Sequence, residues 1–290
     1  MNLRFTVAVQ KGAAMPDRVS RKQLEAFEAV LSDRDKSILN IIWEYRYLTT
    51  DQIKRLCFMG CATDRAALRT ASRVLKKLRE MKLISILDRQ LGGVRAGSGS
   101  YIWYLAPAGG HLLRMMNSTI RAHKKQFEPS TYFLAHTLAV AECYVRITEI
   151  CIDKKMKMTE VQNEPANWRS YNRCGKIASL KPDLFAVTAC GGYEDHWFLE
   201  VDMATESAGK IIEKCHRYHE YYRTGLEQKQ HGVFPLVVWI VPAEARKQNL
   251  MRHIQHEFAK HVRLFVVITF EELEHLLRQG AGESVGLKPC

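Results

Sequence analysis

The sequence has no hydrophobic run long enough to span a membrane. Its longest apolar stretch, 233–241, is interrupted by Pro235, whereas a membrane-spanning helix needs ~20 predominantly apolar residues. The apolar part of the N-terminus, residues 5–9, is too short for a secretion signal. These absences predict a cytoplasmic protein that does not have a membrane among its partners.

Several catalytic motifs are also missing. The chain has neither the GxxxxGK loop that holds nucleotide phosphates nor the GxSxG turn of hydrolases. Its histidine pairs 216/219 and 253/256 have two residues between them, unlike the His-apolar-His metal motif of a relaxase. Its eight cysteines are scattered, which indicates reduced thiols rather than a disulfide framework. Cys57 and Cys61 have no second pair nearby, so we expect free thiols there rather than zinc ligands.

Acidic residues are too few to balance the basic ones. The 290 residues include 43 Lys and Arg against 31 Asp and Glu, which gives a net charge of +12. Residues 1–130 hold 23 basic and 11 acidic residues, whereas the rest of the chain holds 20 of each. A basic domain followed by a neutral one indicates a polyanionic partner whose phosphates meet the first part of the chain.

The basic part has the element order of a winged helix-turn-helix. Apolar residues at helical spacing follow two candidate caps, Ser32 or Asp33 and then Thr49 or Thr50. In this fold the third helix enters the major groove of duplex DNA and a hairpin touches the flanking backbone. The pattern predicts helices at 33–45, 50–57 and 64–82, then strands at 83–89 and 101–106 around a glycine-rich turn at 91–100.

The third predicted helix carries a basic face and an apolar one. Only Asp64 and Glu80 oppose its positive charges, whereas a face that is merely solvated more commonly alternates in sign. The residues near the helix start are candidates for base contacts, and Arg95 for a phosphate or minor-groove contact. The predicted DNA-binding residues are Arg65, Arg69, Thr70, Arg73, Lys76, Lys77 and Arg95. The predicted core face is Leu68, Ala71, Val74, Leu75, Leu78 and Met81.

The length predicts two domains. In the second, a long helix, a strand at 155–165, an irregular segment that ends at residue 180, two hairpin strands and then alternating helices and strands predict an α/β layer with a mixed sheet. The fold class expected for the chain is therefore α+β or α/β. The expected divisions are an N-terminal extension (1–31), the winged-helix domain (32–108), a connecting helix and linker (109–130), the α/β domain (131–279) and a C-terminal tail (280–290).

Carboxylates gather on the two predicted hairpin strands, 181–189 and 196–204. If Gly191 and Gly192 form a two-residue turn, Asp183 lies directly across from Glu200, with side-chain roots ~5 Å apart. A longer turn would pair Asp183 with Asp202 instead, and a slip of one residue would abolish the cluster. The cluster therefore depends on the length of the turn.

Two interpretations of these carboxylates stay open. Oxygen ligands suit Mg²⁺ or Mn²⁺, so Asp183 and Glu200 are candidate metal ligands. Alternatively, the carboxylates take part in structural pairs, such as Lys181 with Asp202. The following helix places Lys210, Lys214 and Arg217 on one stripe, and one of these cations could reach the carboxylates.

A Pro-Asp, a turn, and then Glu-x-Asp followed by a helix resembles the PD-(D/E)xK nuclease superfamily. With a winged helix in front, the chain resembles the replication-relaxation family of plasmid and mobile-element proteins. The likeness covers residues 33–278 and rests on LTTDQIKRL (48–56), YIWYLAPAG (101–109), His136, KPDLFAV, FLEVDMATES and KIIEKCHRY. It implies DNA binding near an origin and assistance to a relaxase, in plasmid replication or conjugative DNA processing.

The sequence departs from the nuclease pattern at one position. Asp202 stands where that pattern has its lysine, and a carboxylate there cannot offset the charge of a phosphate. The resemblance implies that Lys214, and less directly Lys210, supplies the missing cation from the following helix. Glu142 corresponds loosely to an additional acidic residue of some members. The catalytic residues, if the site is active, are Asp183, Glu200, Asp202 and Lys214.

We therefore expect a DNA-binding accessory protein with a degenerate nuclease-like domain, which forms a homo-oligomer and contacts a relaxase or replication protein. One alternative is a Mg²⁺-dependent endonuclease that uses Asp183, Glu200 and Lys214. Another is a transcription regulator whose second domain only dimerises it. No cofactor is certain, although Mg²⁺ or Mn²⁺ fits the endonuclease alternative.

Overall fold

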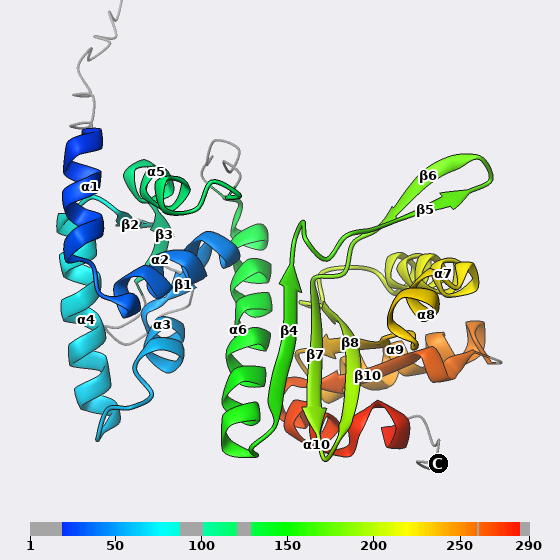
Figure 1. The fold of residues 1–290 in the computed structure, drawn as a ribbon. Coiled ribbons are helices and arrows are strands. Elements are labelled where there is room, and N and C mark those ends of the chain that lie inside the picture. The colour runs from blue at the N-terminus through cyan, green and yellow to red at the C-terminus, as the bar shows by residue number, and fades with distance from the viewer. Residues whose placement is uncertain (1–18, 88–100, 121–128, 260, 285–290) are drawn as a thin grey trace, which may run out of the picture.

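The computed structural model describes residues 19–87, 101–120, 129–259 and 261–284 (Figure 1). Its first part is mostly helical and includes a small antiparallel sheet with strand order β1, β3, β2. The predicted glycine-rich turn, with Arg95, lies outside the described residues. The elements of this part are α1 (Arg21–Val30), α2 (Asp33–Tyr45), β1 (Tyr47–Thr49), α3 (Thr50–Cys57), α4 (Asp64–Glu80), β2 (Ile84–Ile86), β3 (Ile102–Leu105) and α5 (Pro107–Met116).

The predicted order of helices and strands is confirmed, with two additions. Helix α1 forms within the expected N-terminal extension, buries Leu24 and packs against α5. Strand β1 follows α2 and pairs with β3, so that Leu48 lies opposite Trp103. A strand of three residues is too short to show an alternating pattern in the sequence, which is why β1 was not predicted.

Side-chain caps fix where the central helices begin. The Ser32 hydroxyl accepts a hydrogen bond from the Asp35 N–H, and the Thr49 hydroxyl accepts one from the Gln52 N–H. In both cases the third residue also accepts from the cap's own N–H, which completes a capping box. The first of the two candidate residues is therefore the cap at each helix.

The inner face of α4 differs from the prediction at one position. Ala71, Leu75 and Leu78 are buried as expected, but Leu68 is 41% exposed and its assignment to the core was wrong. Ala67 is buried instead. Positions 67, 71, 75 and 78 form one stripe at helical spacing, and the next residue points about 100° further round the helix.

The second part is an α/β structure around a five-stranded mixed sheet, so the predicted fold class is confirmed. Strands β4, β7 and β8 pair antiparallel, whereas β8, β9 and β10 pair parallel. The sheet order is β10, β9, β8, β7, β4. Its elements are α6 (Thr131–Asp153), β4 (Lys157–Asn163), β7 (Leu184–Cys190), β8 (Tyr193–Val201), α7 (Ala208–Thr224), α8 (Leu226–His231), β9 (Leu236–Val241), α9 (Glu244–Glu257), β10 (Phe265–Thr269) and α10 (Leu273–Ser284).

The segment before residue 180, which was expected to be irregular, is a hairpin. Strands β5 (Arg169–Arg173) and β6 (Lys176–Leu180) pair antiparallel and form a sheet of their own. Figure 1 shows this hairpin projecting beyond the main sheet, on the side of α7. Its strands are largely exposed, so they lack the apolar alternation by which a half-buried strand is recognised.

Side chains that alternate along the strands pack into two apolar cores, one on each face of the sheet. Leu184, Ala186 and Leu199 pack on the side of α6 and α10. Phe185 and Phe198, on the other face, pack with residues of α7 and α9. Helices therefore cover both faces, as burial of strands on both sides requires.

The predicted turn and register are confirmed. Cys190 pairs with Tyr193 and Leu184 with Leu199, so Gly191 and Gly192 form a two-residue turn. Their φ values are 60° and 92°, which glycine adopts without steric cost. This register places Asp183, just before β7, next to the end of β8.

The two parts are joined by side-chain contacts between α3 and α6. The Arg55 guanidinium pairs with Glu142 and Glu149, and the Gln52 amide donates to the Leu138 carbonyl. One buried apolar cluster continues from the helices of the first part to α6 and the sheet. Within the described ranges, no helix has the length and apolar character that crossing a membrane requires.

Candidate functional site

Asp183, Glu200 and Lys214 form one cluster. Asp183 lies just before β7, Glu200 lies near the end of β8, and Lys214 is on α7. The Lys214 ammonium pairs with Glu200 and lies 3.9 Å from Asp183 Oδ1. The cation therefore comes from α7, as the resemblance implied, and not from the strand position that Asp202 occupies. The other two cations of the stripe do not reach the carboxylates: Arg217 pairs with Glu213, and Lys210 is exposed.

His136, on α6, completes the surroundings of Asp183. Its Nε2 lies 3.2 Å from Asp183 Oδ2, which also accepts a hydrogen bond of 2.8 Å from the Val201 N–H. Burial alone would raise the pKa of Asp183, but Lys214, His136 and the Val201 N–H lower it to about 2. Burial would lower the pKa of His136, but Asp183 raises it overall. Asp183 is thus held as an anion.

Glu200 is fully buried, with 0% of its surface exposed. One carboxylate oxygen accepts from Lys214 and the other from the Tyr218 hydroxyl. Burial raises the pKa of Glu200 to about 8, against the opposing effect of Lys214. Both oxygens are therefore already used by groups that donate hydrogen bonds.

This arrangement does not fit a divalent cation. Mg²⁺ and Mn²⁺ require several free oxygen ligands, whereas Glu200 bonds Lys214 and Tyr218, and one oxygen of Asp183 contacts Val201 and His136. Across the described part of the chain, no three His, Cys, Asp or Glu side chains are grouped as metal ligands would be. A metal at Asp183 and Glu200 would have to displace Lys214.

Two acidic residues considered from the sequence lie outside the cluster. Strand β8 ends at Val201, so Asp202 leaves the alternation of the strand and pairs with Arg246 at 2.6 Å. Lys181, its expected partner, lies instead over the Trp168 ring. Glu142 faces the first part of the chain, where it pairs with Arg55. The α6 residue that reaches the cluster is His136.

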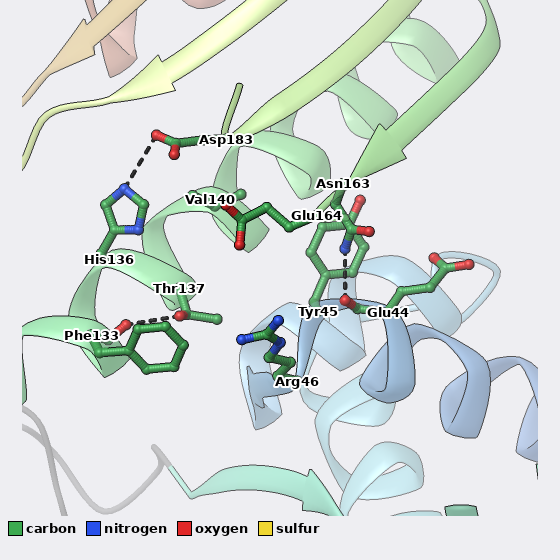
Figure 2. A pocket seen from close by; sticks show the side chains of 10 residues that line it. All are labelled: Glu44, Tyr45, Arg46, Phe133, His136, Thr137, Val140, Asn163, Glu164 and Asp183. Atoms are coloured by element: carbon green, nitrogen blue, oxygen red, sulfur yellow. Dashed lines mark hydrogen bonds and ion pairs between the residues drawn. The ribbon is translucent and has the colours of Figure 1, made fainter. Parts of the chain in front are cut away.

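A cavity of about 170 Å³ opens beside Asp183 and His136, between the two parts of the chain. Figure 2 shows His136 turned toward Asp183 and the Arg46 side chain directed into the same space. Arg46 follows α2 and adopts φ 63° and ψ −47°, a conformation that costs a side-chain-bearing residue energy. The lining residues are Glu44, Tyr45, Arg46, Phe133, His136, Thr137, Val140, Asn163, Glu164 and Asp183.

The predicted DNA-binding residues lie on α4, except Arg95. Arg65, Arg69 and Arg73 are exposed and have no ion-pair partner among the described residues. The other three predicted residues on α4 already contact groups of the protein itself. Lys77 pairs with the buried Asp35 at 2.8 Å, Lys76 lies 3.9 Å from Glu80, and the Thr70 hydroxyl donates to the Ala66 carbonyl.

Sequence reasoning missed three side chains of this site. His136 and Tyr218 were noted only within the motifs that carry the resemblance, without a role in the site, and Arg46 was not considered. Tyr218 follows Lys214 by four residues and therefore lies on the same face of α7, a signal that was available. Nothing in the local pattern relates His136 or Arg46 to Asp183.

Comparison with known proteins gives one family and one solved structure. A family model described as replication-relaxation matches residues 39–237, more than half of the chain. A structure of the restriction endonuclease FokI bound to DNA is 16% identical, with a TM-score of 0.27, over 89% of this chain and 47% of that chain. The chain thus spans about half the length of that structure. No curated protein matches the chain.

Proposed function

Because the chain belongs to the replication-relaxation family, we propose that it is a DNA-binding accessory protein for the replication or conjugative processing of a plasmid or mobile element. In this proposal residues 32–108 act as a winged helix that holds duplex DNA, and residues 131–279 contact a partner such as a relaxase or replication protein. The protein works in the cytoplasm, as a homo-oligomer.

The observation that carries the proposal is the row of exposed arginines on α4, which have no ion-pair partner among the described residues. Arg65, Arg69 and Arg73 follow one another at intervals of four residues, so they lie on one face. The opposite face is anchored by Ala71, Leu75 and Leu78 in the core. Figure 1 shows α4 at the edge of the molecule that faces away from the α/β part, which leaves room for a duplex.

The helix order supports the same assignment. Helix α4 is the third of the three consecutive helices α2, α3 and α4, and β2 and β3 follow it. This is the position of the recognition helix in a winged helix-turn-helix. Arginine suits it because its planar guanidinium binds phosphate and the edge of guanine with two hydrogen bonds.

A mobility-shift titration with a labelled duplex tests the proposal. We expect Arg69→Ala/Arg73→Ala to weaken binding at least tenfold at moderate salt, and to lower the slope of log affinity against log salt by about 1 for each phosphate contact removed. Arg252→Ala/Lys229→Ala removes the same charge from exposed sites of the α/β part and serves as the control. Equal affinities for both double variants would refute the assignment to α4.

The nuclease-like cluster is degenerate in this proposal. Glu200 is buried and both its oxygens accept hydrogen bonds, so the group that would help to hold a metal supports the fold instead. Lys214 then neutralises the carboxylates, and no step of the proposed function passes through them.

A metal-dependent endonuclease is the second candidate, and one observation favours it. Lys214 lies against Glu200 and near Asp183, which combines the two carboxylates and the lysine of the nuclease pattern. Incubation with supercoiled plasmid and Mg²⁺ or Mn²⁺ separates the two candidates. Nicking by the wild type that disappears in Asp183→Ala would establish an endonuclease. A mobility shift without nicking supports the accessory role.

A further inference from the structure

The β5–β6 hairpin stands apart from the main sheet. Its two strands form a sheet of their own, and Figure 1 shows them projecting on the side of the molecule opposite to α4. A two-stranded hairpin is at best marginally stable in water unless other elements support it. The contacts that support this hairpin therefore decide which of its faces remains open to a partner.

One face of the hairpin is held against the α/β part. Tyr171 is buried, and its hydroxyl donates to Glu220 on α7 at 3.3 Å. Arg173 pairs with the same carboxylate at 2.8 Å, and Arg169 pairs with the buried Glu227 on α8 at 2.5 Å. These contacts use both arginines of the hairpin as anchors, so the ribbon has a fixed orientation.

The other face of the hairpin is exposed. Side chains alternate along a strand and directly paired residues share a face, so the neighbours of Tyr171 and their partners on β6 lie on the face that points away from α7. Ile177 is the most exposed of them, at 86%. This outer face consists of Trp168, Ser170, Asn172, Ile177, Ser179 and Lys181.

The hairpin concentrates the positive charge of the α/β part. Residues 165–182 contain four Lys and Arg and no Asp or Glu, whereas the rest of 131–290 contains 16 basic and 20 acidic residues. Lys176, beside the turn, and Lys181 are exposed and have no carboxylate partner among the described residues. The charge of the hairpin is therefore opposite to that of the surrounding chain and complementary to a polyanion.

We propose that the β5–β6 hairpin is a second surface for duplex DNA, so that one chain holds two duplex segments, one on α4 and one on the hairpin. A two-stranded β-ribbon fits the major groove. Lys176 and Lys181 neutralise backbone phosphates, and the central pair Ser170 and Ser179 donates hydrogen bonds to phosphates or base edges. A protein interface would be more apolar at its centre.

The two surfaces take different segments of DNA, because α4 and the hairpin lie on opposite sides of the molecule (Figure 1). The hairpin surface adds to duplex binding by α4 and does not depend on it. A chain with both surfaces brings two segments of a plasmid together.

A capture assay tests the proposal. The full chain is bound to an immobilised 30-base-pair duplex, and a second, fluorescently labelled duplex is added at moderate salt. We expect Lys176→Gln/Lys181→Gln to reduce capture of the second duplex roughly tenfold, whereas the control Lys229→Gln/Arg252→Gln, at exposed sites of α8 and α9, captures it like the wild type. Equal capture by the two double variants, as an oligomer bridging through two α4 helices would give, would overturn the proposal.

Acetylation of surface lysines gives a second test on the unaltered protein. The full chain is acetylated with and without saturating duplex, and the modified lysines are mapped by mass spectrometry. We expect the duplex to protect Lys176 and Lys181 several-fold and to leave Lys229 unchanged. Unprotected hairpin lysines would overturn the proposal.

The same mapping separates this inference from duplex binding by α4. In Arg69→Ala/Arg73→Ala, a high concentration of duplex should still protect Lys176 and Lys181. Protection of the hairpin in a wild type whose affinity this variant does not change would refute the role of α4 alone. Loss of affinity in this variant without protection of the hairpin in the wild type would refute the hairpin surface alone.

Discussion

The arginines of α4 and the charged cluster at Glu200 are built in opposite ways. On α4, Arg65, Arg69 and Arg73 stand in solvent without an ion-pair partner among the described residues. In the α/β part, Glu200 is fully buried and its partners Lys214 and Tyr218 satisfy both oxygens. A charge left unpaired in water remains available to a partner molecule, whereas a charge paired in the interior is needed by the fold itself.

Removal of Lys214 should give the largest effect on stability. Lys214→Met leaves the Asp183 carboxylate without its nearby cation and Glu200 without its ammonium partner, so we expect the free energy of unfolding to fall by about 3–5 kcal/mol in urea titrations. Adding Glu200→Gln should recover part of the loss, because a neutral amide at that position needs no cationic partner, although Asp183 keeps its charge. Lys210→Met, one turn away on α7 and exposed, should change stability by less than about 0.5 kcal/mol. Equal losses at both lysines would contradict the comparison.

Removal of Arg55 should give the second-largest loss of stability, because this residue joins the two parts of the chain. Its guanidinium pairs with Glu142 and Glu149, and hydrogen bonds to charged groups each contribute about 1.5–3 kcal/mol. We expect Arg55→Ala to lower the free energy of unfolding by about 2 kcal/mol. The control is Arg21→Ala, whose pair with Glu25 is exposed and should contribute less than about 1 kcal/mol. A loss no larger than in the control would show that the interface does not depend on this pair.

Lowering the pH should destabilise the protein because it protonates Asp183 in the buried cluster. Its pKa is about 2 in the folded protein against 3.8 as the ordinary value, so its ionised form stabilises the fold above pH 4. That contribution, about 2 kcal/mol, is lost as the pH falls from about 4 to 2. We expect Asp183→Asn to be less stable at neutral pH and to show a smaller loss over this interval. Parallel pH profiles of the variant and the wild type would contradict this assignment.

The sequence allowed the hairpin to be predicted because its determinants are local. Gly191 and Gly192 specify a two-residue turn, and the turn sets the register that brings Asp183 to Glu200. Helical spacing placed Lys210, Lys214 and Arg217 on one stripe of the following helix, and the resemblance to the nuclease pattern singled out Lys214. The contact of His136 with Asp183 could not be predicted, because it depends on how α6 packs against the sheet, 47 residues away along the chain.

The same limit applies to Asp202 and Arg46. Asp202 was placed on the face of Glu200 because the strand was expected to continue to residue 204, but β8 ends at Val201 and Asp202 pairs with Arg246. Arg46 comes from the first part of the chain and enters the cavity through a positive φ. Neither the end of a strand nor an unusual backbone conformation of arginine has a signature in local composition.

The smallest predicted effect is a gain of stability rather than a loss. Arg65, Arg69 and Arg73 are like charges four residues apart on α4, and each such pair destabilises a helix by about 0.2–0.5 kcal/mol. We therefore expect Arg69→Ala to raise the free energy of unfolding by about 0.5 kcal/mol, although the same substitution is expected to weaken duplex binding. The gain should shrink in 1 M salt, because exposed charges are then screened. A loss of about 1 kcal/mol or more would show that Arg69 has a partner within the fold, and the contrast between the surface arginines and the buried cluster would then fail.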